Sequence, residues 1–455
     1  MGPMAGSASP SGMWNCRETA MAAPATLTWS GDMLRKNFPH QRILSLWFAE
    51  LPCDRILRRV LGPSWRQKKP AQGSSPSRVD AGGEPPLVVV AKIRNAQRIV
   101  SLTAPARALG LRRGEALADA RARVPGLLAE EEAPELDAAL LGFIADWCDR
   151  YTPLVALDGT DGLFLDITGC AHLFGGEDAL LADVVQRLEA QGFTVRGALT
   201  DTPGAAWAMA RYGGGACVPP DGQETALAGL PLAALRLENE TVEGLERVGL
   251  TRVGDIAARP RAPLANRFGA QLVRRLDQAF GREGEPISPR FAAPLIVAER
   301  RFFEPIGRLE DVSAVTLSLA GQLCASLERR AEGGRAFELA LYRVDGAVQK
   351  IAVGTSRPLR SAKRILALFA EKLKADENVL DAGYGYDLIR LAVLEAQVAD
   401  PTQPDLSGRG RVEAEADFDG LIDRLGARLG LERVTRLLPV DRHLPESQTQ
   451  LVPAA

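Results

Sequence analysis

The alternation of apolar and polar residues predicts a buried strand at residues 161–169. Leu163, Leu165 and Ile167 alternate there with phenylalanine, aspartate and threonine, and this period of two is typical of a strand with one face in a core. Similar patterns predict strands at residues 42–48, 87–91 and 193–199. Periodicity and helix-start residues predict helices at residues 52–60, 116–123, 137–150, 178–191 and 201–211, and residues 62–86 have the composition of a flexible loop.

The second half of the chain continues this mixture of helices and strands. Residues 230–281 are helical, whereas residues 295–400 combine strands near 337–343 and 351–354 with helices at 314–331 and 361–374. The order of elements predicts an α+β fold with several domains. Near the C-terminus an apolar helical stripe favours a partner-binding helix over a helix buried in a domain; it comprises Phe418, Leu421, Ile422, Leu425 and Leu429. Residues 1–40 lack periodicity and are expected to be a disordered extension or the product of an upstream start codon.

Composition places the chain among globular proteins and limits its chemistry. Hydrophobic residues make up 46% and charged residues 25% of 455 residues, and no apolar stretch approaches the ~20 residues of a membrane span, so we expect a cytoplasmic protein. The six cysteines are widely spaced without a CxxC pair, so neither a zinc site nor a disulfide framework is expected. A net charge of −2 argues against a protein that coats nucleic acid with its whole surface. Any DNA contact must therefore be a local patch.

Two stretches are candidates for such a patch. Residues 245–255 look like a helix-hairpin-helix, in which Gly249, Thr251, Arg252 and Gly254 would bring backbone N–H groups to a phosphate; a plain helical turn is the alternative. Residues 267–270 are a weaker second copy. Residues 343–374 are the most basic stretch, and the candidate DNA contacts there are Arg343, Lys350, Arg357, Arg360, Lys363 and Arg364. A solvated helix face would explain the same charges.

The strand at 161–169 resembles the Asp-Glu-x-Phe-Leu-Asp-h-Thr motif of Y-family (translesion) DNA polymerases, and the resemblance covers about residues 41–400. It implies a palm (residues 41–86 and 135–220), fingers (87–134), a helical thumb with a helix-hairpin-helix (221–290) and a little finger (295–400). A tail that binds the sliding clamp and partner proteins would follow (401–455). In this family the Asp-Glu pair faces two magnesium ions across from a carboxylate on the first palm strand.

Four departures from the family pattern indicate its catalytically defective branch. The first palm strand has Ser45 and Trp47 at two acidic positions, Gly162 replaces the Glu, and Thr202 stands where active members have a lysine. Asp161 alone cannot hold two magnesium ions roughly 3.5–4 Å apart, so no cofactor is expected. The alternative is an active polymerase that requires magnesium and uses displaced carboxylates at positions 50, 54 or 158.

The fourth departure lies in the fingers, where only Arg107 remains of the Tyr-x-x-Arg that grips the triphosphate. The resemblance therefore implies a non-catalytic adaptor in DNA-damage-induced translesion synthesis and mutagenesis. Its partners would be DNA, the sliding clamp, an error-prone DnaE-type polymerase and a RecA-fold protein of the ImuA type. The candidate clamp-binding residues are Gln403, Asp405 and Leu406, with Ser407 in place of the aromatic anchor; a linker with chance similarity is the alternative. A simple DNA-binding module with an inert palm is the third hypothesis.

Overall fold

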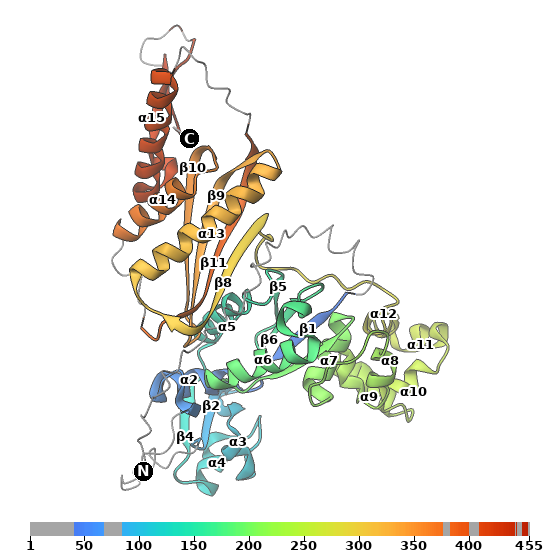
Figure 1. Cartoon of the computed structure of the whole chain (residues 1–455). Coiled ribbons are helices and arrows are strands. Elements are labelled where there is room, and N and C mark those ends of the chain that lie inside the picture. Colours follow the sequence, from blue (N-terminus) through green and yellow to red (C-terminus); the bar gives the residue numbers. More distant parts are fainter. Residues whose placement is uncertain are drawn as a thin grey trace, which may run out of the picture.

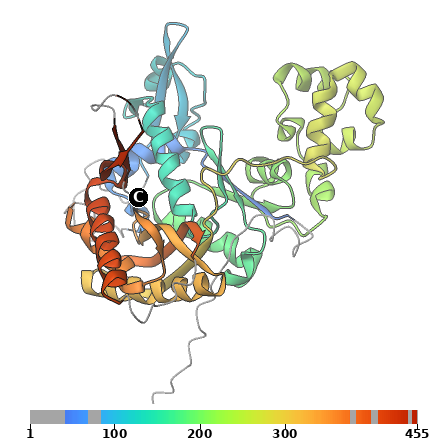
Figure 2. The ribbon, with the colours of Figure 1, turned by 90° about the horizontal axis from the view of Figure 1, so that it is seen from above.

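The computed structural model describes residues 41–67, 84–375, 383–399, 409–441, 443 and 448–453. These residues form four sheets and helices of up to 21 residues. Figures 1 and 2 show the palm at the centre, with the fingers, the thumb and the little finger at separate places around it. The α+β class and the four-part architecture predicted from the sequence are confirmed. In the described part of the chain, no helix is both long and apolar enough to cross a membrane.

The palm sheet joins chain segments from both sides of the fingers. Its strand order is β5 (Val155–Asp158), β6 (Gly162–Asp166), β1 (Ile43–Trp47) and β7 (Arg196–Thr200), and all neighbours are antiparallel. The helices around it are α2 (Leu51–Leu61), α5 (Pro134–Cys148), α6 (Glu177–Ala190) and α7 (Pro203–Tyr212). Leu163 and Leu165 pack with α5 and α6, whereas Phe164 packs against Ala206 of α7. The predicted alternation is therefore correct.

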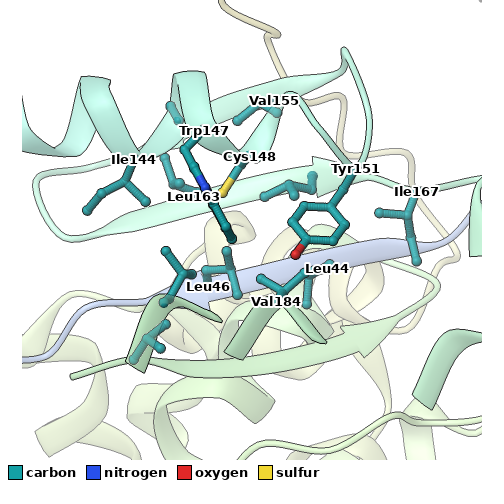
Figure 3. Packing of buried hydrophobic residues seen from close by; sticks show 14 of the residues in the cluster. Leu44, Leu46, Ile144, Trp147, Cys148, Tyr151, Val155, Leu163, Ile167 and Val184 are labelled. Carbon is teal, nitrogen blue, oxygen red and sulfur yellow. The ribbon is translucent and has the colours of Figure 1, made fainter. Parts of the chain in front are cut away.

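The core between the palm sheet and α5 contains several large side chains (Figure 3). The rings of Trp147 and Tyr151 meet edge to face with centroids 5.6 Å apart. Leu44 and Leu46 of β1 are fully buried in the same cluster. Burying a leucine stabilises a fold by about 1.5–3 kcal/mol relative to leaving it exposed. The frame that positions the functional site therefore rests on apolar packing.

The fingers contain more strand than the sequence predicts. β2 (Leu87–Ile93) pairs with β3 (Ala96–Leu102) and with β4 (Leu128–Glu131), and the helices α3 (Ala104–Ala108) and α4 (Leu117–Arg123) pack beside them. The prediction of one strand followed by helices missed β3 and β4. Arg94 and Asn95 both have positive φ, at 49° and 67°, which is the backbone of a two-residue hairpin turn. The dipeptide Arg94-Asn95 is not one of the glycine-containing pairs that indicate such a turn in a sequence, so β3 was missed.

The thumb is built from short helices, as predicted. They are α8 (Gln223–Ala228), α9 (Asn239–Glu246), α10 (Val253–Ala257), α11 (Arg261–Phe268) and α12 (Ala270–Ala279), and their buried apolar residues share a cluster with α7. The thumb thus packs directly on the helix that follows the last palm strand. Figure 2 shows this helical group on the side of the palm away from α15.

The little finger is a four-stranded antiparallel sheet with helices. The strand order is β10 (Val348–Leu359), β9 (Glu332–Arg343), β11 (Tyr386–Val398) and β8 (Ile296–Ile306), of which β8 and β11 were missed by the sequence prediction. α13 (Leu309–Arg329) and α14 (Ala362–Ala375) cover one face. α15 (Arg409–Leu429) lies beside α14, and a hairpin of β12 (Thr435–Pro439) and β13 (Thr449–Pro453) follows it.

Candidate functional site

The candidate site lies where β1 and β6 end side by side. The antiparallel register places Trp47 opposite Gly162 and Ser45 opposite Phe164. Asp161 lies in the turn that joins β5 to β6, directly before Gly162. The strand pairing therefore brings three of the degenerate positions predicted from the sequence, Trp47, Asp161 and Gly162, to one end of the sheet.

Asp161 is held by two cationic or polar donors from distant segments. The indole Nε1 of Trp47 donates to its Oδ2 at 2.9 Å, and Nη2 of Arg211 donates to its Oδ1 at 3.0 Å. The same Nη2 lies 3.2 Å from Oδ2 of Asp158, at the other end of the turn. Arg211 belongs to the last turn of α7 and is largely buried. Two carboxylates thus share one guanidinium.

Burial and charge act against each other in this cluster. Burial raises the pKa of Asp158, and the neighbouring Arg211 opposes that shift. Burial likewise lowers the pKa of Arg211, against the attraction of both carboxylates. An arginine remains charged in proteins, so the positive guanidinium of Arg211 lies between the carboxylates of Asp158 and Asp161.

The residues present do not fit the two magnesium ions of a polymerase. Such a site needs carboxylates on both sides of the metals, but β1 contributes the hydroxyl of Ser45 and the indole of Trp47. The Ser45 side chain is fully buried, and its Oγ has no hydrogen-bond partner among the residues that the structure describes. Among the described residues no group of three or more histidine, cysteine or acidic side chains converges as metal ligands do.

The displaced carboxylates considered from the sequence are engaged elsewhere. Glu50 accepts a hydrogen bond from Arg107 at 2.7 Å, which places the predicted nucleotide-pocket remnant in an ion pair between fingers and palm. Asp54 is fully buried and accepts from the backbone N–H of Thr194 at 2.7 Å. Burial raises the pKa of Asp54 to about 7. With Asp158 bound to Arg211, these three carboxylates lie in three different sets of contacts.

Thr202 and Asp166 have structural contacts that follow from local sequence. The hydroxyl of Thr202 accepts from the backbone N–H of Ala205 at 3.1 Å and so caps α7; it also donates to the carbonyl of Ala279 in the thumb at 2.9 Å. Asp166 accepts from the backbone N–H and the hydroxyl of Thr168. Thr202 thus caps a helix, and Asp166 is a hydrogen-bond acceptor at the end of a strand.

The predicted helix-hairpin-helix has the expected backbone, but its amides are used internally. Gly249 has a φ of +81° between α9 and α10, and Gly269 has a φ of +93° between α11 and α12, at the weaker copy. Asp255 accepts hydrogen bonds from the N–H groups of Thr251 and Arg252 at 3.0 and 2.9 Å. The guanidinium of Arg252 donates to the carbonyl of Gly229. Gly254 lies close to Ala228. A phosphate on these two amides would have to displace Asp255.

The structure divides the six basic residues predicted to bind DNA among different neighbours. Lys350 lies in the contact between little finger and palm, 2.7 Å from Asp149. The others pair as follows: Arg343 with Asp345, Arg357 with Asp419, Arg364 with Asp423, and Arg360 with the carbonyls of Glu332 and Ala399. Lys363 is exposed and makes no ion pair with any described residue. These six residues therefore have separate surroundings, and DNA binding by them stays a prediction.

The tail predictions have different outcomes. Gln403, Asp405 and Leu406 lie outside the described residues. One face of α15 packs on the little finger, where Ile422 and Asp423 are buried. The other face is exposed and includes Phe418, Leu421 and Leu425. Sequence reasoning missed Arg211. The signal for it was its spacing of four residues from Trp207 in a predicted helix, which places both on one helix face.

Comparison with known proteins identifies a family model, relatives and a solved structure that are similar to this chain. The impB/mucB/samB family model matches residues 83–211. DNA polymerase IV of Caulobacter vibrioides is 27% identical over 61% of this chain and 70% of that protein. Among solved structures, the fold is similar to that of DinB from Sulfolobus solfataricus, with a TM-score of 0.42 and 15% identity over 79% of this chain and 100% of that one. The sequence matches thus assign residues 83–211 to the impB/mucB/samB family and show that the chain is similar to a DNA polymerase IV.

A relative with higher sequence identity identifies the family of this chain. Protein ImuB of Caulobacter vibrioides is 42% identical over 339 residues, which are 74% of this chain and 73% of that protein. The chain belongs to the ImuB family.

Proposed function

We propose that the protein is a non-catalytic adaptor in DNA-damage-induced translesion synthesis. The palm carries this proposal, because Trp47 and Arg211 are bound to Asp161 at the end of the sheet where a polymerase would need free carboxylates. Membership of the ImuB family and the match to DNA polymerase IV support a role connected with DNA damage. In this reading the polymerase fold is kept as a scaffold.

The scaffold would act by holding other components together on DNA. Thumb and little finger would contact DNA, and the segment with Gln403, Asp405 and Leu406 would bind the sliding clamp. An error-prone DnaE-type polymerase and a RecA-fold protein of the ImuA type would be recruited. The exposed apolar residues Phe418, Leu421 and Leu425 of α15 support a protein-binding role for the tail.

Primer extension tests whether the protein can synthesise DNA. Wild type and Asp161→Ala are assayed on damaged and undamaged templates with magnesium or manganese. We expect no extension by either protein. Metal-dependent extension that Asp161→Ala abolishes would reject the adaptor and establish an active polymerase that uses displaced carboxylates.

Capture by immobilised sliding clamp tests the recruiting role. The variant Gln403→Ala/Leu406→Ala removes the polar and apolar anchors of the predicted peptide, and Thr402→Ala is the matched control within the same segment. We expect wild type and control to be captured and the double variant to be lost. DNA binding without capture of any of the three proteins would favour the simple DNA-binding module.

A further inference from the structure

The cluster of Asp158, Asp161 and Arg211 contains a cation of its own, the Arg211 guanidinium. Asp158 and Asp161 both direct a carboxylate oxygen at Nη2 of Arg211, at 3.2 and 3.0 Å. Two carboxylates that converge in a partly buried site repel each other unless a positive charge lies between them. In this palm the positive charge comes from the chain itself.

Aromatic rings fix the position of this guanidinium. The centre of the Arg211 guanidinium lies 4.4 Å from the Trp207 ring and 5.6 Å from the Trp47 ring, distances at which a cation is attracted to the face of an indole. The Arg211 side chain is only 9% exposed. Its Nη1 is buried and has no hydrogen-bond acceptor in the described part of the chain, so the two ion pairs at Nη2 and the aromatic contacts hold the guanidinium.

The glycine at position 162 is part of the same arrangement. A Cβ added to Gly162 would lie 2.8 Å from Oδ2 of Asp158 and 3.0 Å from Nη2 of Arg211. The first distance is too short for packed atoms, so a side chain at position 162 must shift the Asp158 carboxylate. The absence of a side chain at position 162 therefore leaves room for the contact between Asp158 and Arg211.

We propose that Arg211 is a built-in cation that replaces a divalent metal at this end of the palm. The palm is then held together without metal, and restoring a carboxylate at position 162 alone does not return metal binding. The inference rests on the proposed loss of catalysis, but it concerns what fills the site and predicts a property that is separate from activity. Removing the arginine should make the palm responsive to metal.

Thermal unfolding of the full chain in EDTA and in manganese chloride tests this proposal. Wild type should have the same Tm in both, and so should Arg211→Lys, which keeps a positive charge. Arg211→Met should have a lower Tm in EDTA and regain at least about 2 °C in manganese, because ligands that bind only the folded state raise Tm. Asp158→Asn in the Arg211→Met background should abolish that gain.

The matched control is Arg196→Met, since Arg196 also lies 5.6 Å from the Trp47 ring but bridges no carboxylate in the described cluster. It should show no manganese response. A manganese response in wild type, or none in a folded Arg211→Met, would overturn the proposal. If Arg211→Met does not fold, Gly162→Glu decides: a lower Tm without manganese response supports the built-in cation, and a manganese-dependent rise refutes it. Primer extension reports on catalysis independently of all these outcomes.

Discussion

Lys350 is a predicted DNA contact, but in the structure it joins the little finger to the palm. Its Nζ lies 2.7 Å from Oδ2 of Asp149 and 3.3 Å from Oδ1 of Asp146, so a little-finger lysine is anchored on two palm carboxylates. Burial acts to lower the pKa of Lys350, but the two carboxylates outweigh it and raise this pKa to about 12. Burial raises the pKa of Asp149 even though Lys350 opposes the shift. The ammonium is therefore charged and held in place at neutral pH.

Lys350→Met keeps most of the side-chain stem and removes the charge. A hydrogen bond to a charged group contributes about 1.5–3 kcal/mol, and the Lys350 and Asp149 side chains are only 25% and 13% exposed, so solvent screens the pair only in part. We expect the free energy of unfolding in urea to fall by about 2 kcal/mol. Lys350→Met combined with Asp149→Asn should recover part of this loss, because the buried carboxylate is then no longer left unpaired.

The salt dependence of DNA binding completes the test. Each phosphate contact adds about 0.9 to the slope of log affinity against log salt. Lys350→Met should leave this slope unchanged, and Lys363→Met, at an exposed position of the same basic stretch, is the matched comparison. A Lys350→Met variant as stable as wild type, with a slope reduced by about one, would refute the reasoning and restore Lys350 as a DNA contact.

Two further predictions concern buried carboxylates. The pKa of Asp54 is raised from 3.8 to about 7 by burial, so its contribution to stability is fully present below pH 3.8 and is lost as the pH rises through about 7. Asp54→Asn should remove this loss of unfolding free energy, which is at most about 3 kcal/mol between pH 5 and pH 7. Urea unfolding of both proteins at both pH values measures it, and the same pH dependence of the unfolding free energy in Asp54→Asn as in wild type would contradict it. Asp423 accepts from the N–H and hydroxyl of Ser356 at 2.6 and 2.7 Å. Asp423→Ala should cost about 2–3 kcal/mol in urea unfolding, whereas the exposed Asp417→Ala should cost less than about 0.5 kcal/mol; equal losses would show that α15 is not anchored there.

Local patterns were sufficient for much of the fold. The alternation around Leu163 and Leu165 predicted β6, and helical spacing predicted α5, α6, α13 and α14 within a few residues. β3 was missed because its pairing depends on a two-residue turn at Arg94 and Asn95. β8 and β11 were missed because each is completed by strands distant in the chain. Strand pairing is a long-range property that a local pattern does not encode.

The sequence by itself determined that this chain has a Y-family polymerase fold whose palm lacks carboxylates at positions 45, 47 and 162. Only the tertiary structure decided what takes their place. Arg211 is 50 positions from Asp161 along the chain, and no spacing rule links them. Likewise, only the packing of the little finger on the palm placed Lys350, a predicted DNA contact, next to Asp149. The sequence gives the charge of each side chain, but its ion-pair partner depends on which distant segments the packing of the core brings together.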